Sequence, residues 1–244
     1  MKVNILGVQI DNLNKAGVLG KVEEFLSDGR QHYIVTPNPE IVVAAEKDKE
    51  FLEILNKADL AVPDGFGLIL ASRYLRRPLS ERITGVDLML EICKMAEQKN
   101  YSVFLVSAKE GLAKPEEVAE ALAKKIPRLK ISGDILARKE TEENLIQKIN
   151  LEKPKILFVA LGAGRQEKLI VKNLDKMPSV KIAMGVGGAF DFIAGKIKRA
   201  PSWMRKIGFE WLWRLFMQPW RLKRILTATI KFSWKVIKNG KKYA

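Results

Sequence analysis

Short apolar runs rich in β-branched residues recur along the chain and alternate with longer segments of helical periodicity. Seven runs have this character: VNILGVQI, HYIVTP, DLAVPDG, YSVFLVS, LKISGD, KILFVALG and VKIAMGVGG. The predicted helices between them cover residues 39–56, 85–98, 115–125, 141–151 and 166–174. Strands that alternate with helices form right-handed βαβ units, whose helices cover both faces of a parallel sheet. The sequence therefore predicts an α/β fold with a Rossmann-like, mainly parallel sheet flanked by helices.

The basic residues and the tryptophans are concentrated at the C-terminal end of the chain. Residues 196–244 contain all five tryptophans and 14 Lys or Arg, but only one acid, Glu210. This segment carries +13 of the formal net charge of +15, so residues 1–195 are nearly neutral. We predict an α/β domain over residues 1–195 and a basic helical appendage over residues 196–244.

The appendage includes a predicted amphipathic helix over residues 219–238. On a helical wheel, one arc is basic (Arg221, Arg224, Lys231, Lys235, Lys238) and the other is apolar (Leu222, Ile225, Leu226, Ile230, Val236, Ile237). Basic amphipathic helices and interfacial tryptophans are typical of proteins that lie on anionic membranes. Packing of these helices on the body is an alternative, and a nucleic-acid surface is another. No nucleic-acid-binding motif is present, so we expect no nucleic-acid partner.

Several classes of chemistry lack the residues they need. The chain has one histidine, His32, and one cysteine, Cys93, which we expect to be a buried helical thiol, so a metal site built from several His or Cys ligands is excluded. We expect no cofactor, since GVGGAFDF does not fit the dinucleotide fingerprint. The Asp-x-Asp triplet by which many nucleotide-sugar transferases hold a divalent metal is also absent, so backbone amides and arginines would have to neutralise the phosphates of a nucleotide sugar. We expect a cytoplasmic protein, since the N-terminal residues contain no secretory signal, and no apolar window is long enough to span a membrane.

The loops that follow the predicted strands hold the candidate site residues, since ligands of open parallel sheets bind at the carboxyl ends of the strands. Asp64 follows an apolar strand in VPDGFG, where a carboxylate can act as a general base, with Arg82 as the nearest candidate cation in the sequence. The alternative is that Asp64 only shapes a turn.

Two further loops carry polar groups suited to a sugar or a phosphate. Thr36 and Asn38 flank a proline and are candidates to bind sugar hydroxyls, although Asn38 can equally serve as a helix cap before Pro39. LGAGRQE joins a buried strand to a helix and offers backbone N–H groups, with Arg165 and Gln166 as additional donors.

The chain resembles the WecG/TagA/CpsF family of bacterial glycosyltransferases. The motifs that carry the resemblance are TPNPEIV, ADLAVPDGFGL, RITGVDLM, LGAGRQEKLI, GVGGAFDFIAGKIKRAP and GFEWLWRLFMQPWRLKR, and they extend over almost the whole chain. One departure is LGAGRQE, where the family pattern is LGxPKQE, so Gly164 and Arg165 replace proline and lysine.

The resemblance implies an inverting, metal-independent enzyme on the inner face of the cell membrane. It implies transfer of N-acetylmannosamine from its UDP donor to the 4-hydroxyl of N-acetylglucosamine on undecaprenyl diphosphate, the linkage-unit step of wall teichoic acid synthesis. The alternatives are another UDP sugar, a non-catalytic membrane-surface protein, or a nucleic-acid binder. A homo-oligomer is expected where no membrane covers the appendage.

The resemblance also implies roles for individual residues. Asp64 is the expected base, beside a sugar pocket, a UDP site and a set of appendage arginines that stabilise the diphosphate, so the membrane-associating appendage of residues 196–244 is expected to complete the active site. The pocket residues are Thr36, Asn38, Arg82 and Gln166; the UDP and diphosphate residues are Gly162, Arg165, Gly187, Gly188, Asp191, Arg214, Arg221 and Arg224.

Overall fold

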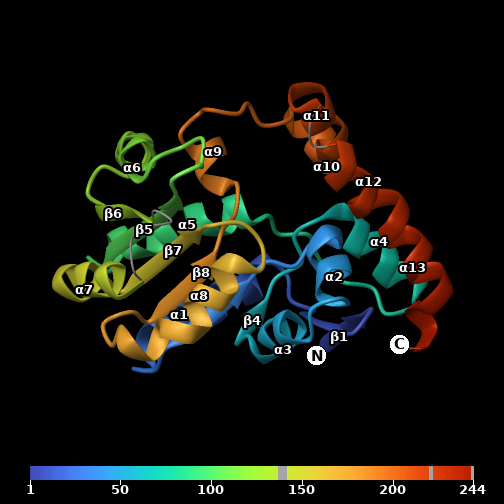
Figure 1. Ribbon diagram of the computed structural model, residues 1–244, viewed down its shortest axis with the longest axis horizontal. Helices are drawn as coiled ribbons and strands as arrows, with labels where there is room; N and C mark the ends of the chain where they lie inside the picture. The colour runs from blue at the N-terminus through green and yellow to red at the C-terminus, as the bar shows by residue number, and fades with distance from the viewer. Residues whose placement is uncertain (137–141, 220–221, 243–244) are drawn as a thin grey trace.

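A six-stranded parallel sheet forms the centre of the molecule, with helices on both faces (Figure 1). The computed structural model describes residues 1–136, 142–219 and 222–242, without the side chains of Lys206, Arg214 and Lys241. The strand order is β4-β3-β8-β7-β5-β6. The strands are β3 (His32–Val35), β4 (Leu60–Ala61), β5 (Ser102–Ala108), β6 (Lys130–Leu136), β7 (Ile156–Ala160) and β8 (Ile182–Gly185). The predicted α/β fold is confirmed.

The first apolar run does not join this sheet. It folds into an antiparallel hairpin of β1 (Lys2–Ile5) and β2 (Val8–Asp11). Leu6 and Gly7 both have positive φ, 52° and 91°, which gives the two-residue turn that suits the twist of a hairpin. Six of the seven predicted strands therefore form the parallel sheet. The first predicted strand does not, because a local turn pairs its two halves with each other.

Nine helices are described before residue 196. They are α1 (Lys15–Ser27), α2 (Pro39–Ala45), α3 (Lys49–Lys57), α4 (Phe66–Tyr74), α5 (Gly85–Gln98), α6 (Pro115–Ala123), α7 (Glu142–Glu152), α8 (Arg165–Asn173) and α9 (Ala189–Ile193). The predicted helix 39–56 is interrupted, since Asp48 accepts a hydrogen bond from Phe51 N (3.0 Å) and caps a new helix, α3. The prediction missed α1, α4 and α9, while Thr141 lies outside the described residues.

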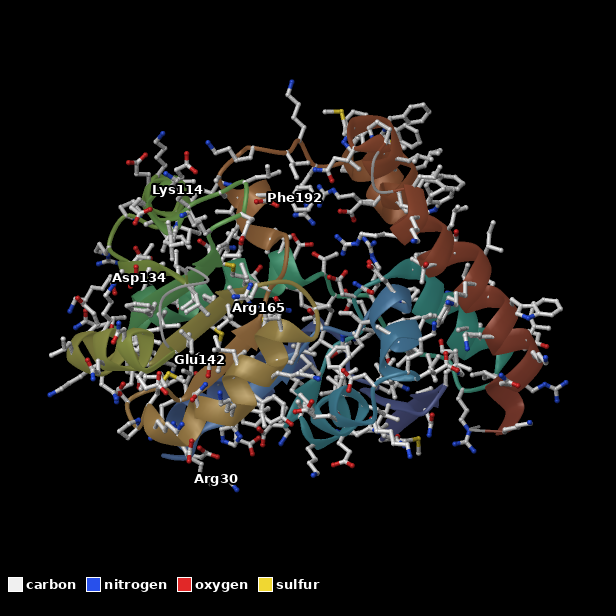
Figure 2. All side chains as sticks on the ribbon, in the orientation of Figure 1. Arg30, Lys114, Asp134, Glu142, Arg165 and Phe192 are labelled. Atoms are coloured by element: carbon white, nitrogen blue, oxygen red, sulfur yellow. The ribbon has the colours of Figure 1, made fainter. Side chains whose placement is uncertain are left out.

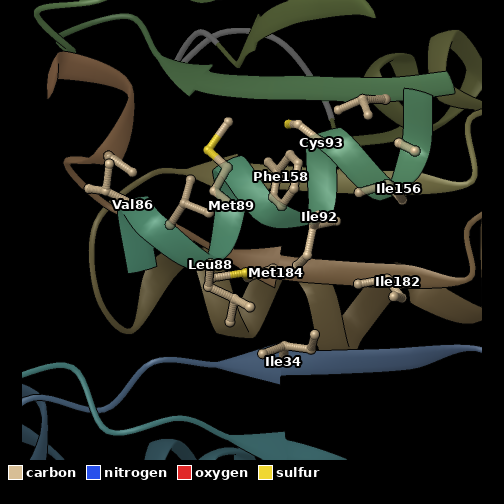
Figure 3. Packing of buried hydrophobic residues seen from close by; sticks show 14 of the residues in the cluster. Ile34, Val86, Leu88, Met89, Ile92, Cys93, Ile156, Phe158, Ile182 and Met184 are labelled. Carbon is tan, nitrogen blue, oxygen red and sulfur yellow. The ribbon is translucent and has the colours of Figure 1, made fainter. Parts of the chain in front are cut away.

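Alternate residues of the central strands point into different cores. Ile156 and Phe158 of β7 pack under α1, α5, α6 and α9, whereas Leu157 and Val159 pack under α7 and α8. Figure 3 shows α5 lying on the sheet, with Phe158 against it. Cys93 of α5 is fully buried, and burial raises the pKa of its thiol to about 12. The predicted buried thiol is confirmed.

The appendage is helical and runs along one side of the body, where it contacts α2 and α4 (Figure 1). Its described elements are α10 (Ser202–Lys206), α11 (Glu210–Met217), α12 (Leu222–Leu226), a π-helical segment (Thr227–Lys231), α13 (Phe232–Asn239) and a final 3-10 turn (Gly240–Lys242). None of the helices in the described parts of the chain is both long and apolar enough to cross a bilayer.

The apolar side of the C-terminal helix is divided between two surroundings. Ile225, Phe232 and Val236 are buried against the body, in contrast to the exposed side chains of Ile230 and Ile237. The single apolar face of the prediction is therefore incorrect. A π-helical segment holds an extra residue, so α13 presents a rotated face relative to α12.

The buried part of this helix generates a stability prediction. Phe232→Ala should lower the free energy of unfolding by about 3 kcal/mol, because it removes an aromatic side chain that is 2% exposed between the appendage and the body. Trp234→Ala, two residues away and 63% exposed, is the matched control and should change it by less than about 0.5 kcal/mol. Urea denaturation measures both, and equal losses would contradict the assignment of the buried face.

Candidate active site

The predicted site residues follow four neighbouring strands. Thr36 and Asn38 follow β3, Asp64 follows β4, Gln166 follows β7 and Gly187 follows β8. These strands are adjacent in the order β4-β3-β8-β7 and all are parallel, so their carboxyl ends lie at one edge of the sheet. The fold therefore brings these residues to the edge at which ligands of such sheets bind.

The carboxylate of Asp64 lies at the N-terminus of α5. Its Oδ2 accepts a hydrogen bond from Gly85 N, the first residue of that helix, at 3.0 Å. The partial positive charge of a helix N-terminus stabilises an ionised carboxylate, the form that a general base requires. A Cβ on Gly85 would lie 3.4 Å from Thr36 Oγ1 and 3.5 Å from Asp64 Oδ2. The hydroxyl of Thr36 and the Asp64 carboxylate thus border the same small space.

Asn38 caps α2. Its Oδ1 accepts a hydrogen bond from Ile41 N at 2.9 Å, and Pro39 occupies the first helical position. The backbone of this loop also supports Asp64, whose N–H donates to Pro37 O at 2.8 Å. The predicted cap is confirmed, and a role for Asn38 in sugar binding stays a prediction.

Arg82 lies on the loop that leads into α5, and the appendage holds its guanidinium. Nη2 donates to Arg205 O at 3.2 Å, and Nη1 lies 3.5 Å from Glu210 Oε2. The side chains of Arg82 and Glu210 are only 18% and 12% exposed. Arg82 was predicted beside Asp64 from sequence proximity, and the structure adds that its two described polar contacts both come from residues after 200.

Gln166 joins the loop after β7 to the loop after β8. Its Oε1 accepts from Gly187 N at 3.0 Å, and its Nε2 donates to Glu167 Oε1 at 2.8 Å. A Cβ on Gly185 would lie only 2.6 Å from Gln166 Nε2, so the glycine allows this side chain to lie against β8. Gln166 is 3% exposed. Its side chain therefore orders two loops of the candidate site.

Glu167 is a residue that the sequence analysis did not single out. It is 2% exposed, and burial raises the pKa of its carboxyl group. Its Oε2 accepts from Gly164 N at 2.7 Å, so one backbone N–H of the loop predicted to bind phosphate already has an acceptor within the protein. A glutamate at the third position of a helix is a sequence signal for a capping box, so the position of Glu167 could have indicated this contact.

The remaining residues of this loop are accessible. Gly162 and Arg165 are exposed, and Figure 2 shows Arg165 at the start of α8. Gly164 has a φ of +84°, which proline cannot adopt. Gly164 stands where the LGxPKQE pattern has proline, so this chain has a backbone conformation at that position that a proline could not adopt.

Asp191 has a described contact within the fold. In the first turn of α9, its Oδ1 accepts from Ala113 N at 3.1 Å and so holds the loop that follows β5. Gly188 precedes α9, and a Cβ there would lie 3.8 Å from Asp191 Oδ2. The predicted UDP role of Gly187, Gly188 and Asp191 stays a prediction.

Of the three appendage arginines predicted to bind diphosphate, only Arg224 has a described side chain. Its Nε and Nη2 donate to the two carboxylate oxygens of Glu40, at 2.7 Å and 3.1 Å. Glu40 lies in the first turn of α2, two residues after Asn38. Arg224 is thus held beside the loop that follows β3. The side chain of Arg214 and the whole of Arg221 lie outside the described residues.

A partly buried ion pair near Asp64 was not predicted. Arg199 Nη1 lies 2.6 Å from Asp87 Oδ1 and Nη2 lies 3.1 Å from Oδ2, and Nη2 also donates to Thr84 Oγ1 at 3.3 Å. Burial alone would raise the pKa of Asp87, but the hydrogen bonds from Arg199 and Thr84 outweigh it and hold that pKa below its ordinary value. The Thr84-x-x-Asp87 spacing is a capping-box signal, whereas nothing in the sequence pairs it with Arg199.

The described residues contain no cluster of three or more His, Cys, Asp or Glu side chains arranged to hold a metal ion. The polar groups gathered at the sheet edge are a carboxylate, hydroxyls, amides and guanidinium groups. Such a set can accept a proton, hydrogen-bond a sugar and neutralise a phosphate.

Comparison with known proteins identifies the family. The model for the glycosyl transferase WecG/TagA/CpsF family matches residues 3–244. An N-acetylglucosaminyldiphosphoundecaprenol N-acetyl-beta-D-mannosaminyltransferase of Bacillus subtilis (strain 168) is 33% identical over 231 residues, which cover 94% of this chain and 89% of the relative. A protein of the same description from Staphylococcus aureus (strain MRSA252) is 34% identical over 243 residues, which cover 99% and 94%. The chain belongs to the WecG/TagA/CpsF family of glycosyl transferases.

Proposed function

We propose that this chain transfers N-acetylmannosamine from UDP-N-acetylmannosamine to the 4-hydroxyl of N-acetylglucosamine on undecaprenyl diphosphate. The product is the disaccharide lipid of the wall teichoic acid linkage unit. The similarity to two transferases of that description over nearly the whole chain supports the reaction. The observation that carries the chemistry is the Asp64 carboxylate, held by a helix N-terminus at the sheet edge where Thr36 and Gln166 also lie.

The proposed mechanism is a single displacement that inverts the anomeric carbon. Asp64 takes the proton of the acceptor hydroxyl as that oxygen forms a bond to the anomeric carbon, and the bond from this carbon to the UDP oxygen breaks. Negative charge then grows on the leaving diphosphate. Backbone N–H groups and the appendage arginines Arg214, Arg221 and Arg224 offset this charge, so no metal ion is required in the proposal.

We further propose that residues 196–244 hold the protein on the cytoplasmic face of the membrane, where the lipid acceptor lies. Of the seventeen large apolar side chains described as exposed, eleven belong to the appendage. They are Trp203, Ile207, Phe209, Trp211, Phe216, Met217, Leu222, Leu226, Ile230, Trp234 and Ile237. Exposed indoles beside many Lys and Arg match the interfacial zone of an anionic bilayer.

Asp64→Asn tests the proposed base. The amide retains the shape of the side chain but cannot take a proton, so kcat should fall by at least about 100-fold. The measurement is release of UDP and formation of disaccharide lipid from UDP-N-acetylmannosamine and a lipid diphosphate acceptor. Asp59→Asn is the control and should keep wild-type turnover. Asp59 lies just before β4, and its carboxylate accepts a hydrogen bond from Tyr33 N. Near wild-type turnover of Asp64→Asn would rule out the base assignment. Competing UDP sugars in the same assay identify the donor.

Ile230→Ala combined with Trp234→Ala tests the membrane surface. Both side chains are exposed, 67% and 63%, so the fold should be retained while partitioning onto vesicles of anionic phospholipid falls at least about tenfold. Leu151→Ala on α7 removes an equally exposed apolar side chain from the body and should leave partitioning unchanged. Sedimentation with vesicles measures all three proteins, and unchanged binding of the double variant would contradict the proposal.

A further inference from the structure

The appendage rests on the two loops that hold Asp64 in place. Gly208, in the turn between α10 and α11, has a φ of +85°, and a Cβ there would lie 2.4 Å from Phe66 Cγ. Phe66 begins α4, two residues after Asp64. The second loop runs from Arg82 to Gly85. Arg199 donates a hydrogen bond to Thr84 of this loop, and Arg82 contacts Arg205 O and Glu210.

Glu210 is unusual within this segment, because it is the single acid among residues 196–244. Its side chain is 12% exposed, and its described ion pair is with Arg82, a predicted site residue. An arginine side chain in water has several rotamers, and fixing one of them has an entropic cost. Glu210 and the carbonyl of Arg205 hold this guanidinium from two sides before any substrate arrives.

We propose that Glu210 is a positioning residue that acts through Arg82. This inference rests on the proposed transferase function. Arg82 is three residues before Gly85, whose N–H holds the Asp64 carboxylate. Ile83 N donates to Pro63 O at 3.1 Å, so the loop of Arg82 lies against the loop of Asp64. A guanidinium fixed on this loop is preorganised for a sugar or phosphate oxygen, and preorganisation of this kind contributes to the rate rather than to folding alone.

Other contacts already provide the attachment of the appendage. Phe232 and Val236 are buried against α2 and α4, and Lys235 Nζ lies 3.0 Å from Glu46 Oε2. The Lys235–Glu46 pair is the same kind of contact as the Arg82–Glu210 pair, but it forms at the end of α2 that is remote from Asn38. It therefore provides a control for loss of an ion pair between the appendage and the body.

The experiment compares Glu210→Gln, Arg82→Gln, the double variant and Glu46→Gln in the full chain. Glu210→Gln should lower kcat by about 10- to 100-fold, with the KM for the UDP sugar changed by less than about threefold. The double variant should be no slower than Arg82→Gln within about threefold, because the proposed effect of Glu210 on the rate passes through Arg82. Glu46→Gln should keep wild-type kcat. Limited proteolysis with a protease that cleaves after lysine and arginine should cut residues 196–206 at the same rate in Glu210→Gln as in the wild-type protein, which would show that the appendage stays docked.

Four results would overturn the inference. Wild-type or higher kcat in Glu210→Gln would mean that the acid has no effect on Arg82 or restrains it. Losses that multiply in the double variant would mean that the two residues act independently. Increased cleavage of the appendage in Glu210→Gln would assign the effect to docking alone, and an equal kcat loss in Glu46→Gln would do the same.

The proposed function can fail separately. If the wild-type protein transfers no sugar from any UDP donor, the proposed reaction is wrong. The thermal unfolding of the same four proteins then tests the Arg82–Glu210 pair without an assay of turnover. Melting-temperature losses of the two single variants that add up fully in the double variant would show that the pair is not coupled, and would overturn the inference as well.

Discussion

Parallel pairing of six strands directs every strand toward the same edge of the sheet, and the candidate site depends on that alignment. β4, β3, β8 and β7 are neighbours, so loops that are far apart in the sequence meet at their carboxyl ends. The hydrogen bond from Gly85 N to Asp64 Oδ2 then holds the candidate base at the N-terminus of α5, whose partial positive charge favours a carboxylate. The helix itself is fixed by the core under it, where Val86, Met89 and Ile92 pack on the sheet (Figure 3).

The basic appendage uses its charge in two ways. Some of its cations pair with acids of the body: Arg199 with Asp87, Arg224 with Glu40 and Lys235 with Glu46. The same segment carries exposed aromatic and aliphatic side chains on α10 to α13. One helical segment therefore both attaches to the body and presents an amphipathic surface. Both interpretations of this segment, packing and membrane contact, have support in the same helix.

The buried charges near the site follow one pattern. Glu167 and Glu210 are largely removed from water and Asp87 is partly buried, and each contacts a group that belongs to a candidate site loop. A buried carboxylate is unfavourable unless hydrogen bonds compensate for its desolvation, so it is retained where those bonds also orient other groups. The contacts of these acids are the physical link between the fold and the proposed chemistry.

The α/β class, six of the strands, the division of charge and the loops that contain Thr36, Asp64 and Gln166 could be predicted from the amino-acid sequence. These features depend on local periodicity and on the order of elements, which a single chain displays directly. Three features became visible only in the folded chain: the first run forms a hairpin, the appendage helix has two apolar faces, and Arg82 contacts Arg205, 123 residues away. The fold also pairs Arg199 with Asp87 and buries Glu167 beside Gln166. Such pairings depend on the path of the chain through space. Several acids could pair with a given arginine, and only the packing of the folded chain brings one of them close enough to do so.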